Sequence, residues 1–121
     1  MIRSHRDLEV WQRALDLAQE CYRVSSAFPR SELYGLTLQL RKSAGSVPAN
    51  IAEGRGRRTT KEFIRFIDIA YGSLMELETH MELARRLDFC ETSQADAIIR
   101  QSALVGRMLN SLRTSLQAKI L

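Results

Sequence analysis

The sequence has few of the features that mark secreted, disulfide-stabilised or membrane-spanning proteins. It contains two cysteines, too few for a disulfide scaffold, and we expect Cys21 and Cys90 to be small core hydrophobes. No stretch approaches the roughly 20 apolar residues of a membrane span. Residues 1–7 lack the apolar core of a signal peptide. We therefore expect a cytoplasmic protein with no membrane contact.

Residues that build common catalytic and metal sites are also scarce. The two histidines, His5 and His80, belong to no Glu-x-x-His pair, although a di-iron site in a helical bundle needs two such pairs. Neither histidine lies in a recognisable pocket-forming loop, where it could activate a serine or cysteine nucleophile. The glycine-rich residues 54–58 follow no strand pattern and precede no Gly-Lys-Ser/Thr, so they are not a nucleotide-binding loop. We expect no enzyme, cofactor or metal site.

Apolar residues recur at spacings of three and four in four successive segments, a period typical of amphipathic helices. The first segment should end near residues 28–29, since proline disfavours the helical conformation in the residue before it. Ser31 is expected to cap the second helix. Pro48 lies within that helix and predicts a kink around residues 44–45.

Local signals also place the remaining helix boundaries. Gly54 and Gly56 supply the conformational freedom to end the second helix. A capping box of Thr59 and Glu62 opens the third helix, which continues to about Leu87. Thr92 or Ser93 should cap the fourth helix, and no segment alternates like a strand. Because short loops make successive helices antiparallel neighbours, we predict an all-α, antiparallel up-down-up-down four-helix bundle, with residues 1–121 as a single domain.

Charge is segregated along the chain. Residues 41–65 carry seven basic and two acidic side chains, whereas residues 66–96 carry two basic and seven acidic ones. Arginines gathered where the third helix begins suit a phosphate backbone, because free amides and the helix dipole already favour an anion there. The candidate nucleic-acid-binding residues are Arg41, Lys42, Arg55, Arg57, Arg58, Lys61 and Arg65.

Two other interpretations of these charges remain open. They could be ordinary solvated charges, or they could pair with the acidic region of the same or a neighbouring subunit. No aromatic side chains interleave with the arginines, so any nucleic-acid binding should depend on the phosphate backbone and on salt rather than on base sequence.

The apolar faces of the first and third helices are wider than one bundle core requires, which indicates a homo-oligomer. Trp11 and Tyr22 could be core fillers or interface anchors.

Several blocks of sequence resemble the four-helix-bundle proteins encoded in intervening sequences of bacterial 23S rRNA genes, which carry an S23-type ribosomal-protein label. The resemblance covers roughly residues 8–89, and its most specific parts are Asn50-Ile51-Ala52-Glu53-Gly54 and Gly72-Ser73-x-x-Glu76. That family is similar to the accessory variability determinant of diversity-generating retroelements. The resemblance therefore implies a ring-shaped homopentamer that binds RNA or DNA and partners a reverse transcriptase, with no catalytic residue to assign.

Two functions follow as hypotheses from the sequence. The first is an oligomeric, non-catalytic nucleic-acid-binding accessory protein, in which several copies of the basic segment form one positive surface. The second is an oligomeric scaffold for protein–protein interaction that binds no nucleic acid. Their salt dependence should differ, because phosphate binding weakens steeply with ionic strength whereas an apolar interface does not.

Overall fold

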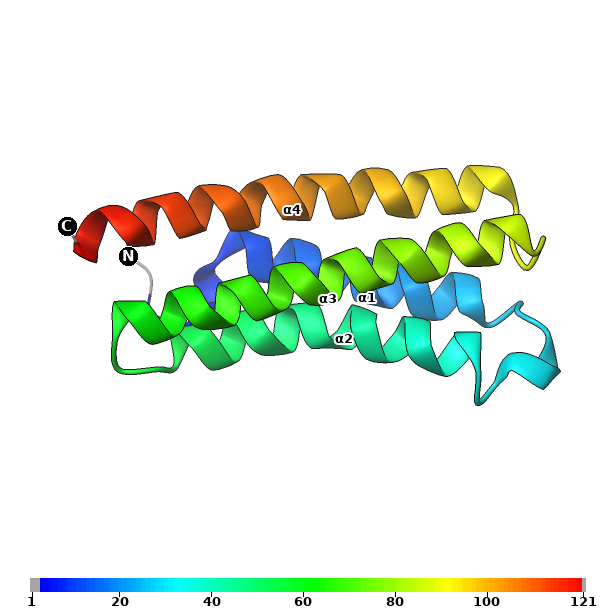
Figure 1. Cartoon of the computed structure of the whole chain (residues 1–121), viewed down its shortest axis with the longest axis horizontal. Helices are drawn as coiled ribbons and strands as arrows, with labels where there is room; N and C mark the ends of the chain where they lie inside the picture. Colours follow the sequence, from blue (N-terminus) through cyan, green and yellow to red (C-terminus); the bar gives the residue numbers. More distant parts are fainter. Residues whose placement is uncertain (1–2, 121) are drawn as a thin grey trace.

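The computed structural model describes residues 3–120, and they form four long antiparallel helices (Figure 1). The helices are α1 (Glu9–Ser25), α2 (Leu36–Arg55), α3 (Thr60–Arg86) and α4 (Thr92–Ile120), with short 3-10 turns at η1 (His5–Asp7) and η2 (Arg30–Glu32). Consecutive helices pack together, and α1 also packs against α4, which closes the bundle. Within the described residues no strand occurs, and the predicted all-α, up-down-up-down fold is confirmed.

The core consists of aliphatic side chains that all four helices contribute. Its largest fully buried members include Leu17 of α1, Leu40 and Ile51 of α2, Leu74 and Leu77 of α3, and Ile98 and Leu109 of α4. Cys21 is fully buried among them as predicted, and burial raises the pKa of its thiol to about 12. Cys90 departs from the prediction, because it lies in the α3–α4 connection and is only half-buried.

The helix termini agree with the sequence at α3 and differ at two other helices. Thr59 caps α3 by accepting a hydrogen bond from the Glu62 backbone N–H at 3.1 Å, which is the Thr59 half of the predicted capping box. Ser31 does not cap α2, because it lies inside η2; Glu32 Oε1 instead accepts from the N–H of Leu36, the first residue of α2, at 3.0 Å. The Glu32 side chain is longer than that of serine, so its carboxylate reaches across the intervening turn to the first residue of α2.

The fourth helix begins one or two residues earlier than predicted. Thr92 is already its first residue, so neither Thr92 nor Ser93 is the cap. The side-chain oxygen of Gln94 instead accepts a hydrogen bond from the preceding Glu91 N–H at 3.1 Å.

Helix α2 continues unbroken through Pro48. Pro48 leaves the carbonyl of Ala44, four residues earlier, without its helical donor. Side-chain hydrogen bonds involve Ser46, two residues further along. Asn50 Nδ2 donates to the backbone oxygen of Ser46 at 2.8 Å, and the Ser46 and Ser73 hydroxyls share a hydrogen bond of 2.8 Å between α2 and α3. The sequence blocks around Asn50 and Ser73 therefore meet across the α2–α3 contact.

Helices α2 and α3 approach each other closely where α2 ends. Gly54 is buried, and a Cβ atom there would lie 2.7 Å from Phe66 Cβ and 3.2 Å from the backbone oxygen of Phe63. Gly56, the residue after α2, has φ −80°, a value that any residue can adopt. The predicted need for glycine's conformational freedom at Gly56 is therefore wrong. The close approach of α2 to α3 requires a glycine at position 54.

Over the part of the chain that the structure describes, no helix is both long enough and apolar enough to cross a membrane.

Candidate nucleic-acid interface

The start of α1, the α2–α3 turn and the end of α4 lie at one end of the bundle (Figure 1), which we call the basic end. Its positive side chains come from α2, the turn, the first turns of α3 and the last turn of α4: Arg55, Arg57, Arg58, Lys61, Arg65 and Lys119. The short α2–α3 turn, fixed by the Gly54 contact, brings the first five of them together.

Two of these arginines pack on one aromatic ring. The guanidinium carbons of Arg57 and Arg65 lie 4.7 Å and 5.2 Å from the centroid of the Phe66 ring. Each also pairs with an exposed carboxylate on its own side of the turn, Arg57 with Glu53 at 3.7 Å and Arg65 with Glu62 at 3.8 Å. Such exposed pairs contribute about 0–1 kcal/mol, so a phosphate can replace the carboxylate at little cost. The ring holds the guanidinium groups in place while their charge stays at the surface.

Arg58 and Lys61 are also exposed to solvent. Within residues 3–120 neither side chain takes part in an ion pair or a hydrogen bond. The backbone N–H groups of Thr60 and Lys61, the first two residues of α3, have no acceptor within the helix. Their dipoles and the two cationic side chains favour an anion at the same place.

Arg55 faces the N-terminal turn rather than open solvent. Asp7 Oδ2 accepts hydrogen bonds from the backbone N–H groups of Arg3 at 2.8 Å and Ser4 at 3.3 Å. These bonds hold the pKa of the Asp7 carboxyl below its usual value, and the positive charge of Arg55 acts in the same direction. Asp7 therefore stays ionised beside Arg55 and offsets part of its charge.

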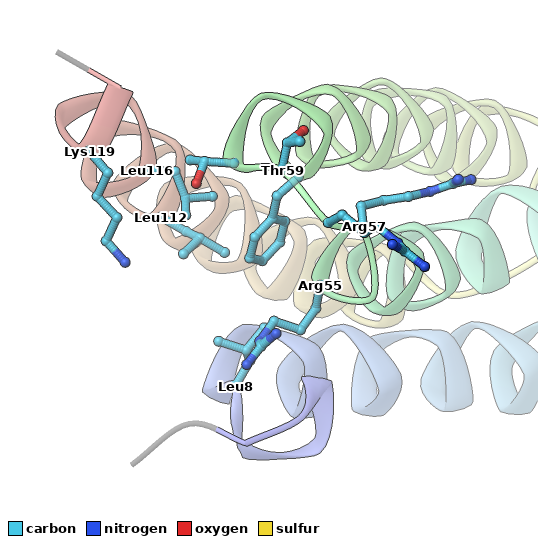
Figure 2. A pocket seen from close by; sticks show the side chains of 10 residues that line it. Leu8, Arg55, Arg57, Thr59, Leu112, Leu116 and Lys119 are labelled. Atoms are coloured by element: carbon cyan, nitrogen blue, oxygen red, sulfur yellow. The ribbon is translucent and has the colours of Figure 1, made fainter.

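The basic end also contains a hollow of about 330 Å³. Figure 2 shows its lining, in which Leu8 comes from the segment before α1, Arg55 and Arg57 from the α2 end and turn, and Lys119 from α4. The sequence prediction omitted Lys119, because it lies 54 residues beyond Arg65 and no local pattern connects the two. The overall basic bias of residues 97–121, which contain four basic and no acidic side chains, was the only available signal.

The structure does not bring Arg41 and Lys42 to the basic end. Arg41 precedes Arg55 by 14 residues of one helix, a separation of about 21 Å along its axis. Arg41 Nε donates to Ser25 Oγ at 2.9 Å, its Nη2 donates to the Tyr22 backbone oxygen at 3.3 Å, and its guanidinium lies over the Tyr22 ring at 4.8 Å. Arg41 therefore caps the C-terminus of α1, while Lys42 is exposed beside it.

Among residues 3–120, histidine, cysteine and acidic side chains form no group of three that could hold a metal ion. What the basic end can do with these residues is hold an extended anion by several guanidinium and ammonium groups at once.

The fold and this surface define a small antiparallel four-helix bundle with a cationic end. The chain belongs to the 23S rRNA-intervening sequence protein family, whose model matches residues 6–111. The family identified from the sequence blocks is thereby confirmed.

A solved structure gives the same architecture. A protein of unknown function from the S23 ribosomal protein family of Bacteroides thetaiotaomicron aligns with a TM-score of 0.78 and 23% identity, covering 86% of this chain and 97% of that one. At this identity the likeness shows the fold. No curated protein matches the chain.

Proposed function

We propose that this protein is a non-catalytic accessory protein that binds the phosphate backbone of RNA or DNA through its basic end. The single observation that carries the proposal is the convergence of six cationic side chains from α2, the α2–α3 turn, α3 and α4 on one end of the bundle. Arg58 and Lys61 stand beside the free amides of α3, so charge and hydrogen-bond donors point to the same anion.

Oligomerisation would strengthen such binding. One basic end offers a few phosphate contacts, whereas several copies joined in one assembly act at a high effective concentration. Apolar side chains beyond the core support an assembly: Leu15 and Tyr22 of α1 are 45% and 50% exposed, and Ile69 and Leu83 of α3 are 39% and 45% exposed. From the resemblance to the accessory variability determinant we propose a homopentamer in the cytoplasm, with a reverse transcriptase as a possible protein partner.

The salt dependence of binding tests the proposal. We would measure fluorescence anisotropy of a labelled duplex and a labelled single strand between about 25 and 200 mM salt. Each phosphate contact contributes about −0.9 to the slope of log K against log salt for a duplex. Replacing both Arg57 and Arg58 with alanine should therefore reduce the magnitude of the slope by about two for every sequence tested.

A matched control has the same loss of charge at another place. Arg100 and Arg107 are exposed on α4, about 28 Å and 18 Å along the helix from Lys119. Replacing these two with alanine should leave the slope nearly unchanged, because they lie outside the basic end. The proposal fails if the Arg57 and Arg58 double variant keeps its helicity and binds both nucleic acids like the native protein at low salt.

The exposed apolar residues of α1 and α3 also favour a second candidate, an oligomeric scaffold for protein–protein interaction. A scaffold would assemble through these faces and show no binding of nucleic acid at low salt. The anisotropy measurement thus separates the two functions.

A further inference from the structure

The hollow in the basic end has an apolar floor and a cationic rim, whereas a surface that binds only phosphate needs no apolar floor. Its floor is apolar and comes from three separate parts of the chain: Leu8 and Leu116 are 7% and 6% exposed, and Phe63 and Leu112 are half-buried beside them. Its rim is cationic, with Arg55, Arg57, Arg58 and Lys119. Among the described residues that line the hollow, none is acidic.

We propose that this hollow accepts one unpaired nucleotide, with the base against the apolar floor and the phosphate at the cationic rim. The inference rests on the proposed nucleic-acid binding and adds a preference for single strands over duplex. The volume of about 330 Å³ lies at the lower end of the range for small-molecule pockets, about 300–1,000 Å³, which suits a single base and its sugar.

The chemistry of the floor favours a base over other anionic groups. An inorganic phosphate has no apolar surface to place against Leu8, Leu112 or Leu116, and a duplex backbone presents charged phosphates and only small sugar C–H surfaces to them. A base has an apolar face, and the Phe63 ring offers an aromatic partner of the kind on which single-stranded bases stack. In a duplex the faces of internal bases are already stacked on their neighbours, so only unpaired nucleotides can enter.

The side chains of Thr59 and Thr60 add hydroxyl groups between the floor and the rim. Each hydroxyl can donate a hydrogen bond to a sugar or phosphate oxygen, although Thr59 Oγ1 also accepts from the Glu62 N–H, and the free amides of α3 begin beside them. The same hollow thus offers apolar side chains for a base and cationic side chains for a phosphate.

The test compares a labelled ten-nucleotide single strand with its duplex, using the native protein and Leu112→Ala. Leu112→Ala removes apolar carbons that would contact the base, so it should weaken single-strand binding by about 5- to 30-fold and leave duplex binding unchanged. The control is Leu104→Ala, a half-buried leucine on the same helix about 12 Å away, which should change neither affinity.

A second measurement needs no variant. In the native protein, adenosine monophosphate should shift the methyl NMR signals of Leu112 and Leu116 at millimolar concentration, whereas ribose 5-phosphate should not. Equal binding of single strand and duplex, with no effect of Leu112→Ala and no methyl shifts, would overturn the inference and leave the proposed function intact. If the native protein binds neither single strand nor duplex at low salt, both the inference and the proposed function are wrong.

Discussion

Arg41 shows how one side chain changes role once its neighbours are known. Arg41 reaches from α2 to the last turn of α1, where it donates to the Ser25 hydroxyl and adds a second donor to the Tyr22 carbonyl, which also accepts from the Ser26 N–H at 3.2 Å. Its guanidinium also lies on the Tyr22 ring, whose hydroxyl-bearing side chain is 50% exposed. These contacts join α1 to α2 and engage the donors that a phosphate would need.

We therefore predict that Arg41→Ala lowers the free energy of unfolding by about 1–2 kcal/mol, through the lost charge-assisted hydrogen bonds and ring contact. Urea denaturation measures the effect. Lys42→Ala, the exposed neighbour, is the control and should change stability by less than about 0.5 kcal/mol. Both variants should bind nucleic acid equally well. Unchanged stability with weakened binding in Arg41→Ala would restore Arg41 to the binding site.

Asp88 is a second residue for which the structure changes the interpretation, because its backbone conformation affects the stability of the protein. It has φ 60°, in the left-handed region, and follows the last turn of α3. The N–H of Phe89 donates to the Ala84 oxygen at 2.9 Å and the N–H of Asp88 to the Arg85 oxygen at 3.1 Å, the hydrogen-bond pattern of a Schellman C-cap. Glycine is the residue that this position favours, because a Cβ atom strains the left-handed conformation.

Asp88→Gly should accordingly raise the free energy of unfolding by about 0.5–1 kcal/mol. The gain comes from relieved backbone strain and from removing a negative charge at a helix C-terminus. Asp88→Ala separates these causes, since it removes the charge but keeps the Cβ atom. Thermal denaturation that finds Asp88→Ala as stable as Asp88→Gly would assign the effect to charge instead of conformation.

At the scale of elements, the α2–α3 pair organises the molecule. It places two glycines in opposite environments: Gly54 is packed against α3, whereas a Cβ atom at Gly72 would meet no atom within 4 Å. Both are helical and both belong to the blocks by which the family resemblance was found. The two glycines of these blocks therefore do not share one packing role.

Alanine substitution at the two glycines should have opposite effects. Gly54→Ala would force Phe66 Cβ and a backbone oxygen away, and should lower the free energy of unfolding by about 1–3 kcal/mol. Gly72→Ala, the control, should raise it by about 0.5–1 kcal/mol, because alanine is the better helix former and has room there. Chemical denaturation checks both. A tolerated Gly54→Ala would mean that α2 and α3 can separate at this end without cost.

At the scale of the whole molecule, the charges and the apolar surface are distributed unevenly. Six positive side chains gather at the basic end, while six of the seven acidic residues of 66–96 lie in the far half of α3, in the α3–α4 connection or in the first turns of α4. The bidentate ion pair of Arg113 with Asp68, at 2.7 Å and 3.2 Å, fastens α4 to α3 between these regions. Exposed apolar residues such as Leu15 and Ile69 lie on the flanks of the bundle.

This distribution predicts assembly through the flanks of the bundle with the basic ends left accessible. Light scattering at micromolar concentrations should give a multiple of the 13.8 kDa chain, with about 69 kDa for the pentamer favoured by the resemblance. Leu15→Glu should shift the protein toward smaller species while helicity stays the same, because a charge in an apolar interface is costly. A native protein that remains monomeric throughout this range would rule out the assembly.

Most of the fold could be predicted because helical patterning is local. The spacing of apolar residues fixed the four helices, and the Thr59 cap of α3 needs only residues three apart. The cap of α2 was misplaced because Glu32 acts across a turn whose path the sequence does not reveal. Leu15 fits the apolar period of α1 yet lies at the surface. The period shows which face of a helix is apolar, but it does not show how much of that face the core covers.

The candidate site was predictable only where its residues are neighbours in sequence. Residues 55–65 span one turn and two helix ends, so their convergence follows from a short loop alone. The exclusion of Arg41 and the addition of Lys119 depend on helix length and direction: 14 residues of α2 carry Arg41 about 21 Å away, whereas α4 returns Lys119 to the basic end. Sequence by itself determined the helices, through a period that each segment carries within itself. Tertiary structure alone decided which charges and leucines share the hollow, because side chains distant in sequence meet only when the whole bundle has packed.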